Sequence, residues 1–179
     1  DRLYFAFRLP VDGTDDYFAC SLALDIIGGL STSRLVQRLV RDEQAATSLS
    51  AHAMGFVDGV SLGLVSVDVA EGMDPADIER AVCEELDRFI AEGPTVIELE
   101  SSMAETEMSC LSSLASQDER ADAISHHTML DDDPYFVNSF LQRIAAITPD
   151  RIQSAAASWL QPGSRAVVSY IVKQEDQPA

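Results

Sequence analysis

The sequence predicts an α+β domain with two layers, in which helices cover one face of a mainly antiparallel sheet. Three observations lead to this fold class. Runs with strand character stand near both ends of the chain, a β-hairpin pattern lies in its first half, and most of the remaining residues show the apolar spacing of helices. The predicted order is therefore strand, two helices, two strands, a long helical run and a strand.

The first strand is followed by two helices that meet at a pair of glycines. The run LYFAFRL is rich in aromatic and aliphatic residues and ends at a proline, as expected of a strand and a turn. Thr14 has the character of a helix N-cap, and Gly28 and Gly29 end the helix that it begins. Residues 31–33 then offer side-chain oxygens to cap a second helix.

A hairpin and a helical run make up the rest of the chain. A Val-Asp-Gly turn signal at residues 57–59 separates two β-rich stretches. Thr95 and Glu98 have capping-box spacing, and Trp159 shares an apolar helical face that should bury it. The pattern RAVVSYIV closes the chain as a strand. The four predicted helical segments cover residues 74–93, 94–116, 131–147 and 148–163.

These elements predict one domain over residues 1–173 and a disordered tail over residues 174–179. The chain begins inside a strand pattern without an initiator methionine, which indicates a piece of a larger protein. A hydrophobic fraction of 46% with 23% charged residues is typical of a packed globular protein. No apolar run approaches the roughly 20 residues of a membrane span. The compartment is left open, with a soluble, cytoplasmic setting slightly favoured.

The charge of the chain excludes one class of partner. A formal net charge of -18, from 30 acidic and 12 basic residues, argues against nucleic acid and anionic membranes, because binding to phosphate requires a basic face. Two interpretations of the acidity stay open. It provides solubility, or it forms a surface that attracts cationic peptides.

The residues indicate neither a metal site nor a catalytic site. Cys20, Cys83 and Cys110 are odd in number and widely spaced in apolar helical patterns, so we expect buried thiols. His126 and His127 precede three aspartates, but adjacent helical residues point about 100° apart and cannot both face one ion. We interpret that segment as solvated polar residues at a helix end. The isolated chain is expected to bind no zinc and to cleave no peptide.

A family resemblance is carried by four segments that span nearly the whole chain. They are RLYFAFRLP with DDYFACSLALDIIGGLSTSRLVQRLVRDEQ, ADIERAVCEELDRFIAEGPTVIEL, LDDDPYFVNSFLQRIAAITPDRIQSAA and ASWLQPGSRAVVSYIV. No single motif is specific to one family, but the order and spacing of the four segments are specific. In this arrangement the chain resembles the non-catalytic domain of the pitrilysin/insulinase family of zinc peptidases, which includes the mitochondrial processing peptidase. The resemblance implies a processing-peptidase-like fold.

The resemblance also implies a role for the domain. In such enzymes two halves, each with two domains of this type, close like a clamshell around an unfolded peptide. The zinc lies in another copy of the domain, on a helix with the motif H-x-x-E-H, which this chain lacks. The chain would therefore close the chamber and bind extended peptide with a catalytic domain located in cis or in a partner chain. One alternative is a scaffold or assembly subunit of a non-peptidase branch, and another is a module that assembles through its own sheet edge.

The family supplies an arginine and a tyrosine, seven positions apart, on the helix after the glycines. The ungapped match places Val40 and Thr47 at these positions, so both residues are missing, which supports the scaffold alternative. Arg41, one position along, is rotated by about 100° on a helix and is interpreted as a surface charge.

Five residues are possible chamber-facing or partner-facing positions. The glycines leave backbone exposed at the bend, and the arginines form the densest basic cluster of an acidic chain, although they could also pair locally with surface acids. Replacing both arginines of the set with alanine is expected to weaken association and to leave thermal stability nearly unchanged. The five residues are Gly28, Gly29, Ser33, Arg34 and Arg41.

Overall fold

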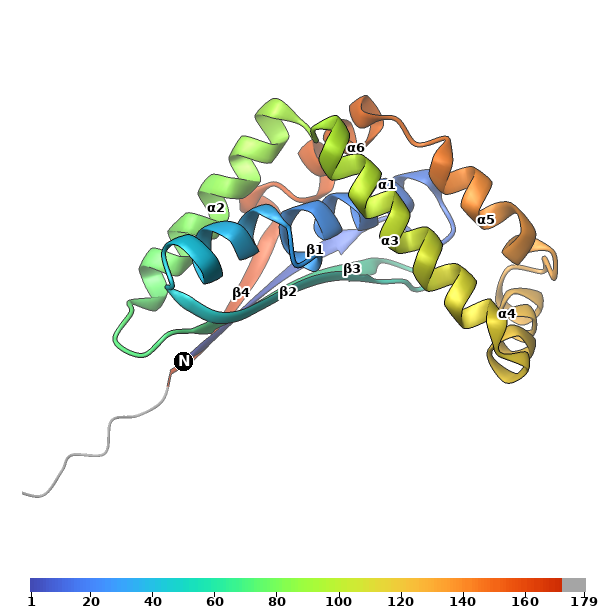
Figure 1. Cartoon of the computed structure of the whole chain (residues 1–179), viewed down its shortest axis with the longest axis horizontal. Coiled ribbons are helices and arrows are strands. Elements are labelled where there is room, and N and C mark those ends of the chain that lie inside the picture. Colours follow the sequence, from blue (N-terminus) through green and yellow to red (C-terminus); the bar gives the residue numbers. More distant parts are fainter. Residues whose placement is uncertain (172–179) are drawn as a thin grey trace, which may run out of the picture.

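The computed structural model describes residues 1–171, in which four strands form one antiparallel sheet with the order β2-β3-β1-β4. The helices gather on one side of this sheet (Figure 1). The predicted α+β architecture is therefore confirmed. The predicted tail at 174–179 lies outside the described residues, and the domain boundary at 173 stays a prediction. The strands are β1 (Arg2–Leu9), β2 (Ala46–Met54), β3 (Ser61–Val69) and β4 (Arg165–Tyr170).

Strand β1 lies between β3 and β4 in the sheet, and its residues alternate between an apolar and a polar side. Leu3, Phe5, Phe7 and Leu9 are all at most 1% exposed, whereas Arg8 points to the other face. The same alternation runs along β3, which pairs with β1 over eight residue pairs. The buried side of the sheet therefore forms one wall of the hydrophobic core.

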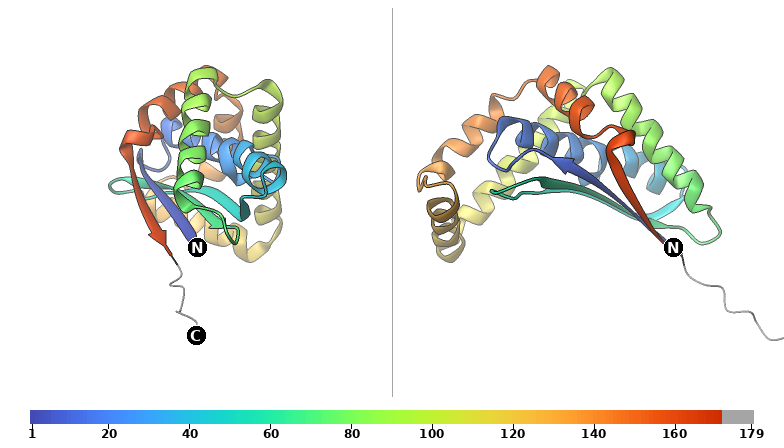
Figure 2. Two further views of the ribbon diagram at one scale, coloured as in Figure 1. Left: turned by 90° about the vertical axis from the view of Figure 1, so that its left-hand side faces the viewer. Right: turned by 180° about the vertical axis from the view of Figure 1, so that it is seen from behind.

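Within residues 1–171, six α-helices follow the polar segments and caps of the sequence, and Figure 2 shows them from two further sides. The side chains of Thr14, Thr95 and Thr148 accept the expected N-cap hydrogen bonds, and Glu98 completes the capping box. These caps satisfy amide groups that the first turn of a helix leaves free. The helices are α1 (Asp15–Leu24), α2 (Pro75–Glu92), α3 (Val96–Ala115), α4 (Gln117–Leu130), α5 (Phe136–Ala145) and α6 (Pro149–Trp159).

Three short helical segments have other geometries. The chain is π-helical over η1 (Asp25–Gly29), which continues α1, and over η2 (Val36–Asp42), and it forms a short 3-10 helix at η3 (Pro162–Ser164). The hairpin turn is confirmed, with Gly59 at a φ of 107°, a left-handed conformation that glycine adopts without steric cost.

The structure differs from the sequence predictions at helix α4 and at Trp159. Helix α4 was not predicted, because it contains no buried residue and so lacks the apolar period that marks a helix in a sequence. Trp159 packs against the core but is only partly buried, since it stands at the last position of α6.

The core lies between the sheet and helices α1, α2 and α6, and it includes Phe18, Leu86, Phe89 and Ile152. Helices α3 and α5 contribute few buried side chains to it, among them Ile144. Within the described residues no helix is both long and apolar enough to cross a membrane. The loosely packed helices α3, α4 and α5 line a hollow that forms part of the candidate site below.

Candidate functional site

The candidate site begins where α1 turns into the π-helical segment η1. Gly28 is buried, and a Cβ atom at this position would lie 2.8 Å from a methyl carbon of Leu49 and 3.0 Å from the Cβ of Ala51. Gly29 is exposed, but a Cβ there would lie 2.9 Å from the carbonyl oxygen of Ala51 and from Asp25 Oδ1. The two glycines therefore allow the bend to pack closely on β2.

Replacing Gly28 with alanine is expected to lower the free energy of unfolding by about 1 to 2 kcal/mol, because the new methyl group would lie 3.0 Å from the Cβ of Ala51, which can move only with the backbone of β2, and 2.8 Å from Leu49. Chemical denaturation measures the loss. Gly163→Ala is the matched control, since a Cβ at Gly163 meets no atom within 4 Å. Equal stability of the two variants would contradict the close packing at Gly28.

Ser33, which precedes the second helix, does not act as the side-chain cap that the sequence predicts. It is 3% exposed, and its hydroxyl has no hydrogen-bond partner within the described residues. Its main-chain carbonyl accepts a hydrogen bond from the amide of Gln37 at 2.9 Å. The side chain therefore lies beneath the surface and not on it.

Arg34 lies at the centre of an ion-pair network between α2 and α3. Its Nε and Nη2 donate to the two carboxylate oxygens of Glu98 at 2.6 and 2.8 Å, and Nη2 also donates to the carbonyl of Gly93 at 2.9 Å. Nη1 lies 3.9 Å from Glu85, and the guanidinium carbon lies 5.0 Å from the ring centroid of Phe89. Only 13% of the side chain is exposed. This geometry changes the expectation for Arg34, because a bidentate, mostly buried arginine contributes to stability.

The basic side chains of η2, which follow Arg34 in the chain, lie nearer the surface. Arg38 bridges Glu43 and Glu84 with hydrogen bonds of 2.8 Å each. Arg41 is exposed and donates one hydrogen bond, of 2.8 Å, to the carbonyl oxygen of Ser31. Arg41 and Gly29 are therefore the exposed members of the predicted partner-facing set.

Val40 and Thr47, the two positions that the resemblance matches to the family's arginine and tyrosine, lie on either side of the η2–β2 connection. Val40 packs partly against the core, and Thr47 is exposed at an irregularity in the pairing of β2 with β3. The Thr47 hydroxyl donates to the carbonyl oxygen of Asp68 at 3.3 Å. Neither side chain carries a charge or a phenol that could hold a substrate.

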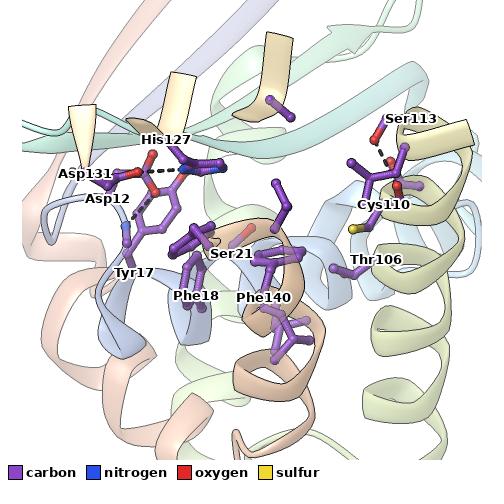
Figure 3. Close-up of a pocket in the computed structure, with 18 of the residues that line it drawn as sticks. Asp12, Tyr17, Phe18, Ser21, Thr106, Cys110, Ser113, His127, Asp131 and Phe140 are labelled. Atoms are coloured by element: carbon purple, nitrogen blue, oxygen red, sulfur yellow. Dashed lines mark hydrogen bonds and ion pairs between the residues drawn. The ribbon is translucent and has the colours of Figure 1, made fainter. Parts of the chain in front are cut away.

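A cavity of about 510 Å³ lies between α1, α3, α4 and α5 (Figure 3). In Figure 3 the rings of Phe18 and Phe140 stand side by side on one wall, and Cys110 and Thr106 of α3 lie opposite. Phe18 contacts Phe140 edge to face, with ring centroids 5.5 Å apart. The cavity was not visible from the sequence because it is formed by helices distant along the chain.

One end of this cavity carries the carboxylate of Asp25. Its Oδ2 accepts a long hydrogen bond, 3.4 Å, from the hydroxyl of the fully buried Ser102. Glu105 lies one turn beyond Ser102 on the same face of α3 and also lines the cavity. Burial raises the pKa of Asp25 to about 6, the Ser102 hydroxyl lowers it, and the charge of Glu105 raises it further.

The other end of the cavity is closed by His127 of α4. Its Nδ1 lies 2.6 Å from Asp131 Oδ2, and its ring stacks on Phe136 with centroids 4.2 Å apart. His126 meets the His127 ring edge-on at 5.1 Å. No group of three or more His, Cys, Asp and Glu side chains in residues 1–171 has the geometry to hold a metal ion.

Sequence reasoning missed Asp25 and Glu105, although one of them left a signal. Asp25 stands within the apolar run LALDIIGG, where a charged residue is unexpected on a helix that packs into the core. Glu105 left no such signal, because the surrounding segment is polar on several sides. Cys20 is buried as predicted, whereas Cys83 and Cys110 are partly exposed.

The chain is similar to known proteins in sequence and in fold. The family model of the Peptidase M16 inactive domain matches residues 1–105, and none of the curated proteins matches the chain. The fold is similar to the inactive peptidase domain of a candidate zinc protease from Bordetella parapertussis. That structure is 21% identical, covers 99% of this chain and 94% of its own, and gives a TM-score of 0.88.

Two further structures share the fold. A candidate zinc protease from Bordetella pertussis is 20% identical over 96% of this chain and 94% of its own, with a TM-score of 0.83. A chain of complex III from Candida albicans is 14% identical over 93% of this chain and 42% of its own, with a TM-score of 0.74. At these identities the similarity concerns the fold alone.

Proposed function

Because the chain belongs to the Peptidase M16 inactive domain family, we propose that it is the non-catalytic domain of a zinc-dependent peptidase. It closes a clamshell chamber with a catalytic domain that carries H-x-x-E-H, in cis or in a partner chain, and binds extended peptide there. The match of the family model over residues 1–105 is the observation that carries this proposal. The zinc belongs to the catalytic domain, and the cytoplasm stays the slightly favoured compartment.

The exposed corner at η1 and η2 is the surface proposed to face the catalytic domain. Gly29 presents backbone there, and Arg41 presents a guanidinium whose one hydrogen bond is to a main-chain carbonyl. Such a group retains donors for a carboxylate of a partner or of a peptide. Arg34 supports this corner from beneath through Glu98.

The test mixes the 179-residue chain with a zinc-loaded catalytic domain from the same or a neighbouring gene. The chain alone is expected to leave a quenched fluorescent peptide intact, and the mixture is expected to associate and to cleave it faster than the catalytic domain alone. Arg41→Ala should weaken association, whereas the exposed control Arg80→Ala should not. The proposal fails if the two domains neither associate nor change the rate of cleavage.

One observation favours the scaffold function as a second candidate. Val40 and Thr47 stand where substrate-holding side chains would be needed, and neither can replace them. A scaffold would associate with its partner with the same Arg41 dependence, but the assembled pair would cleave no peptide. The same mixing experiment therefore separates the two functions.

The isolated chain is expected to retain much less than one zinc ion per molecule after incubation with zinc and dialysis. The physical reason is that, in residues 1–171, no three ligand side chains converge. Elemental analysis by mass spectrometry measures the zinc content. One tightly held ion per chain would contradict the prediction.

A further inference from the structure

The cavity between α1, α3, α4 and α5 combines an apolar wall with carboxylates that have no ion-pair partner among the described residues. Its middle is lined by Phe18, Leu22 and Phe140, and one end by Asp25 and Glu105. Its volume of about 510 Å³ falls within the range of pockets that hold small organic ligands. The cavity therefore has both the size and the chemical gradient of a ligand site.

The basic side chains near this cavity already have other partners. Arg143 lies over the ring of Phe18, with its guanidinium carbon 5.0 Å from the centroid, but it donates to Asp15 and to the carbonyl of Gly13. His127 is paired with Asp131 at the opposite end. Among the described residues, neither Asp25 nor Glu105 has an ion-pair partner.

A carboxylate in this position is costly unless a cation joins it. Asp25 accepts one long hydrogen bond from Ser102, and its second oxygen lies against Gly29. Two carboxyl groups that share one end of a cavity repel each other when both are ionised. A ligand cation placed between them would relieve the repulsion and supply the missing charge-assisted hydrogen bonds.

We propose that this cavity binds an organic cation with an apolar body, whose ammonium or guanidinium group lies at Asp25 and Glu105 and whose hydrocarbon part packs on Phe18 and Phe140. Glu105 also lines a second hollow of about 400 Å³, formed with residues 29–32 and Ser101 at the exposed corner. The chemistry fits a free amine and also the basic side chain of a peptide. The site depends on this chain alone and not on the proposed peptidase role.

The charge requirement is tested with two probes of equal shape. 4-Phenylbutylamine is expected to bind the 179-residue chain in a calorimetric titration. The affinity of its neutral analogue 4-phenylbutan-1-ol is expected to be lower by a factor of about ten or more. Binding of the amine should also weaken below about pH 6, where Asp25 takes up a proton. Equal affinity for amine and alcohol would overturn the proposal.

Variants at the two carboxylates assign the binding to this end of the cavity. Glu105→Gln is expected to weaken binding of the amine about tenfold, and Asp25→Asn at least as much. Glu107→Gln is the matched control, because Glu107 stands about 200° away around α3 and lines a different hollow. Unchanged affinity in Glu105→Gln and Asp25→Asn would show that the amine does not bind here.

The cysteines provide a readout that does not depend on mutation. Cys110 lines the cavity and Cys83 lies on α2, and both are partly exposed. The amine is expected to slow alkylation of Cys110 by iodoacetamide severalfold and to leave the rate at Cys83 unchanged. Equal rates at Cys110 with and without a saturating amount of amine would overturn the proposal.

Two peptide arms distinguish the source of the cation. A short capped peptide with one arginine competes with the amine if the natural ligand is a peptide side chain, and its citrulline analogue does not. If the arginine peptide fails to compete while the amine still binds, the site takes free amines. Either result supports a cation site. If the citrulline peptide competed as well as the arginine peptide, the site would not select for charge and the proposal would be contradicted.

Discussion

Replacing Arg34 with alanine is expected to lower the free energy of unfolding by about 3 kcal/mol. The guanidinium joins Glu85 of α2 to Glu98 of α3, and only 13% of its side chain is exposed. Its removal leaves Glu85, which is 3% exposed, with Arg88 as its ion-pair partner at 3.2 Å. Because Arg88 remains, the loss lies at the low end of the range for a broken buried pair. Chemical denaturation near neutral pH measures it.

Two variants keep this prediction specific. Arg34→Lys retains the charge but not the two parallel hydrogen bonds to Glu98, so it should lie between the alanine variant and the unchanged chain. Arg41→Ala, at an exposed arginine of the same segment, should alter stability by less than about 0.5 kcal/mol. If Arg34→Ala were as stable as Arg41→Ala, Arg34 would be a surface charge and the network would have no structural role.

The contrast between these arginines shows what the local sequence could predict. The apolar period and the caps identified most helices, because such signals depend on residues three or four positions apart. The environment of Arg34 depends on Glu98, which is 64 positions away. A cluster of arginines in a helix gives the same pattern whether its members face solvent or a buried carboxylate.

Helix α4 and the cavity are two further features that local sequence patterns do not reveal. Gln117–Leu130 buries no residue, so the rule that apolar side chains repeat on one face had nothing to detect. The cavity takes its walls from four helices, and its charged end from Asp25 and Glu105, which meet because Ser102 of α3 packs on α1. The sequence nevertheless predicted the bend at Gly28 and Gly29 that positions this end of α1.

Asp25 makes the stability of the chain depend on pH in a defined direction. Burial raises its pKa from an ordinary value of 3.8 to about 6, with Glu105 adding to the rise and Ser102 opposing it. The folded chain therefore binds this proton more tightly than the unfolded chain does. Stability from this group is present below its ordinary pKa and is lost as the pH rises through the interval up to about 6. Above that interval the buried charge destabilises the fold.

Asp25→Asn is accordingly expected to stabilise the chain by about 2 to 3 kcal/mol well above pH 6, since a shift of one pKa unit corresponds to about 1.4 kcal/mol. Asparagine keeps the acceptor for the Ser102 hydroxyl but carries no charge toward Glu105. Near pH 4, where Asp25 is protonated in the folded chain, the two chains should differ by less than about 0.5 kcal/mol. Denaturant titrations of both chains across this interval measure the effect of Asp25 together with its repulsion by Glu105, because all other carboxylates are the same in the two chains. A variant that is less stable than the unchanged chain at every pH would mean that the ionised carboxylate is a stabilising group, and the cavity would then need no external cation.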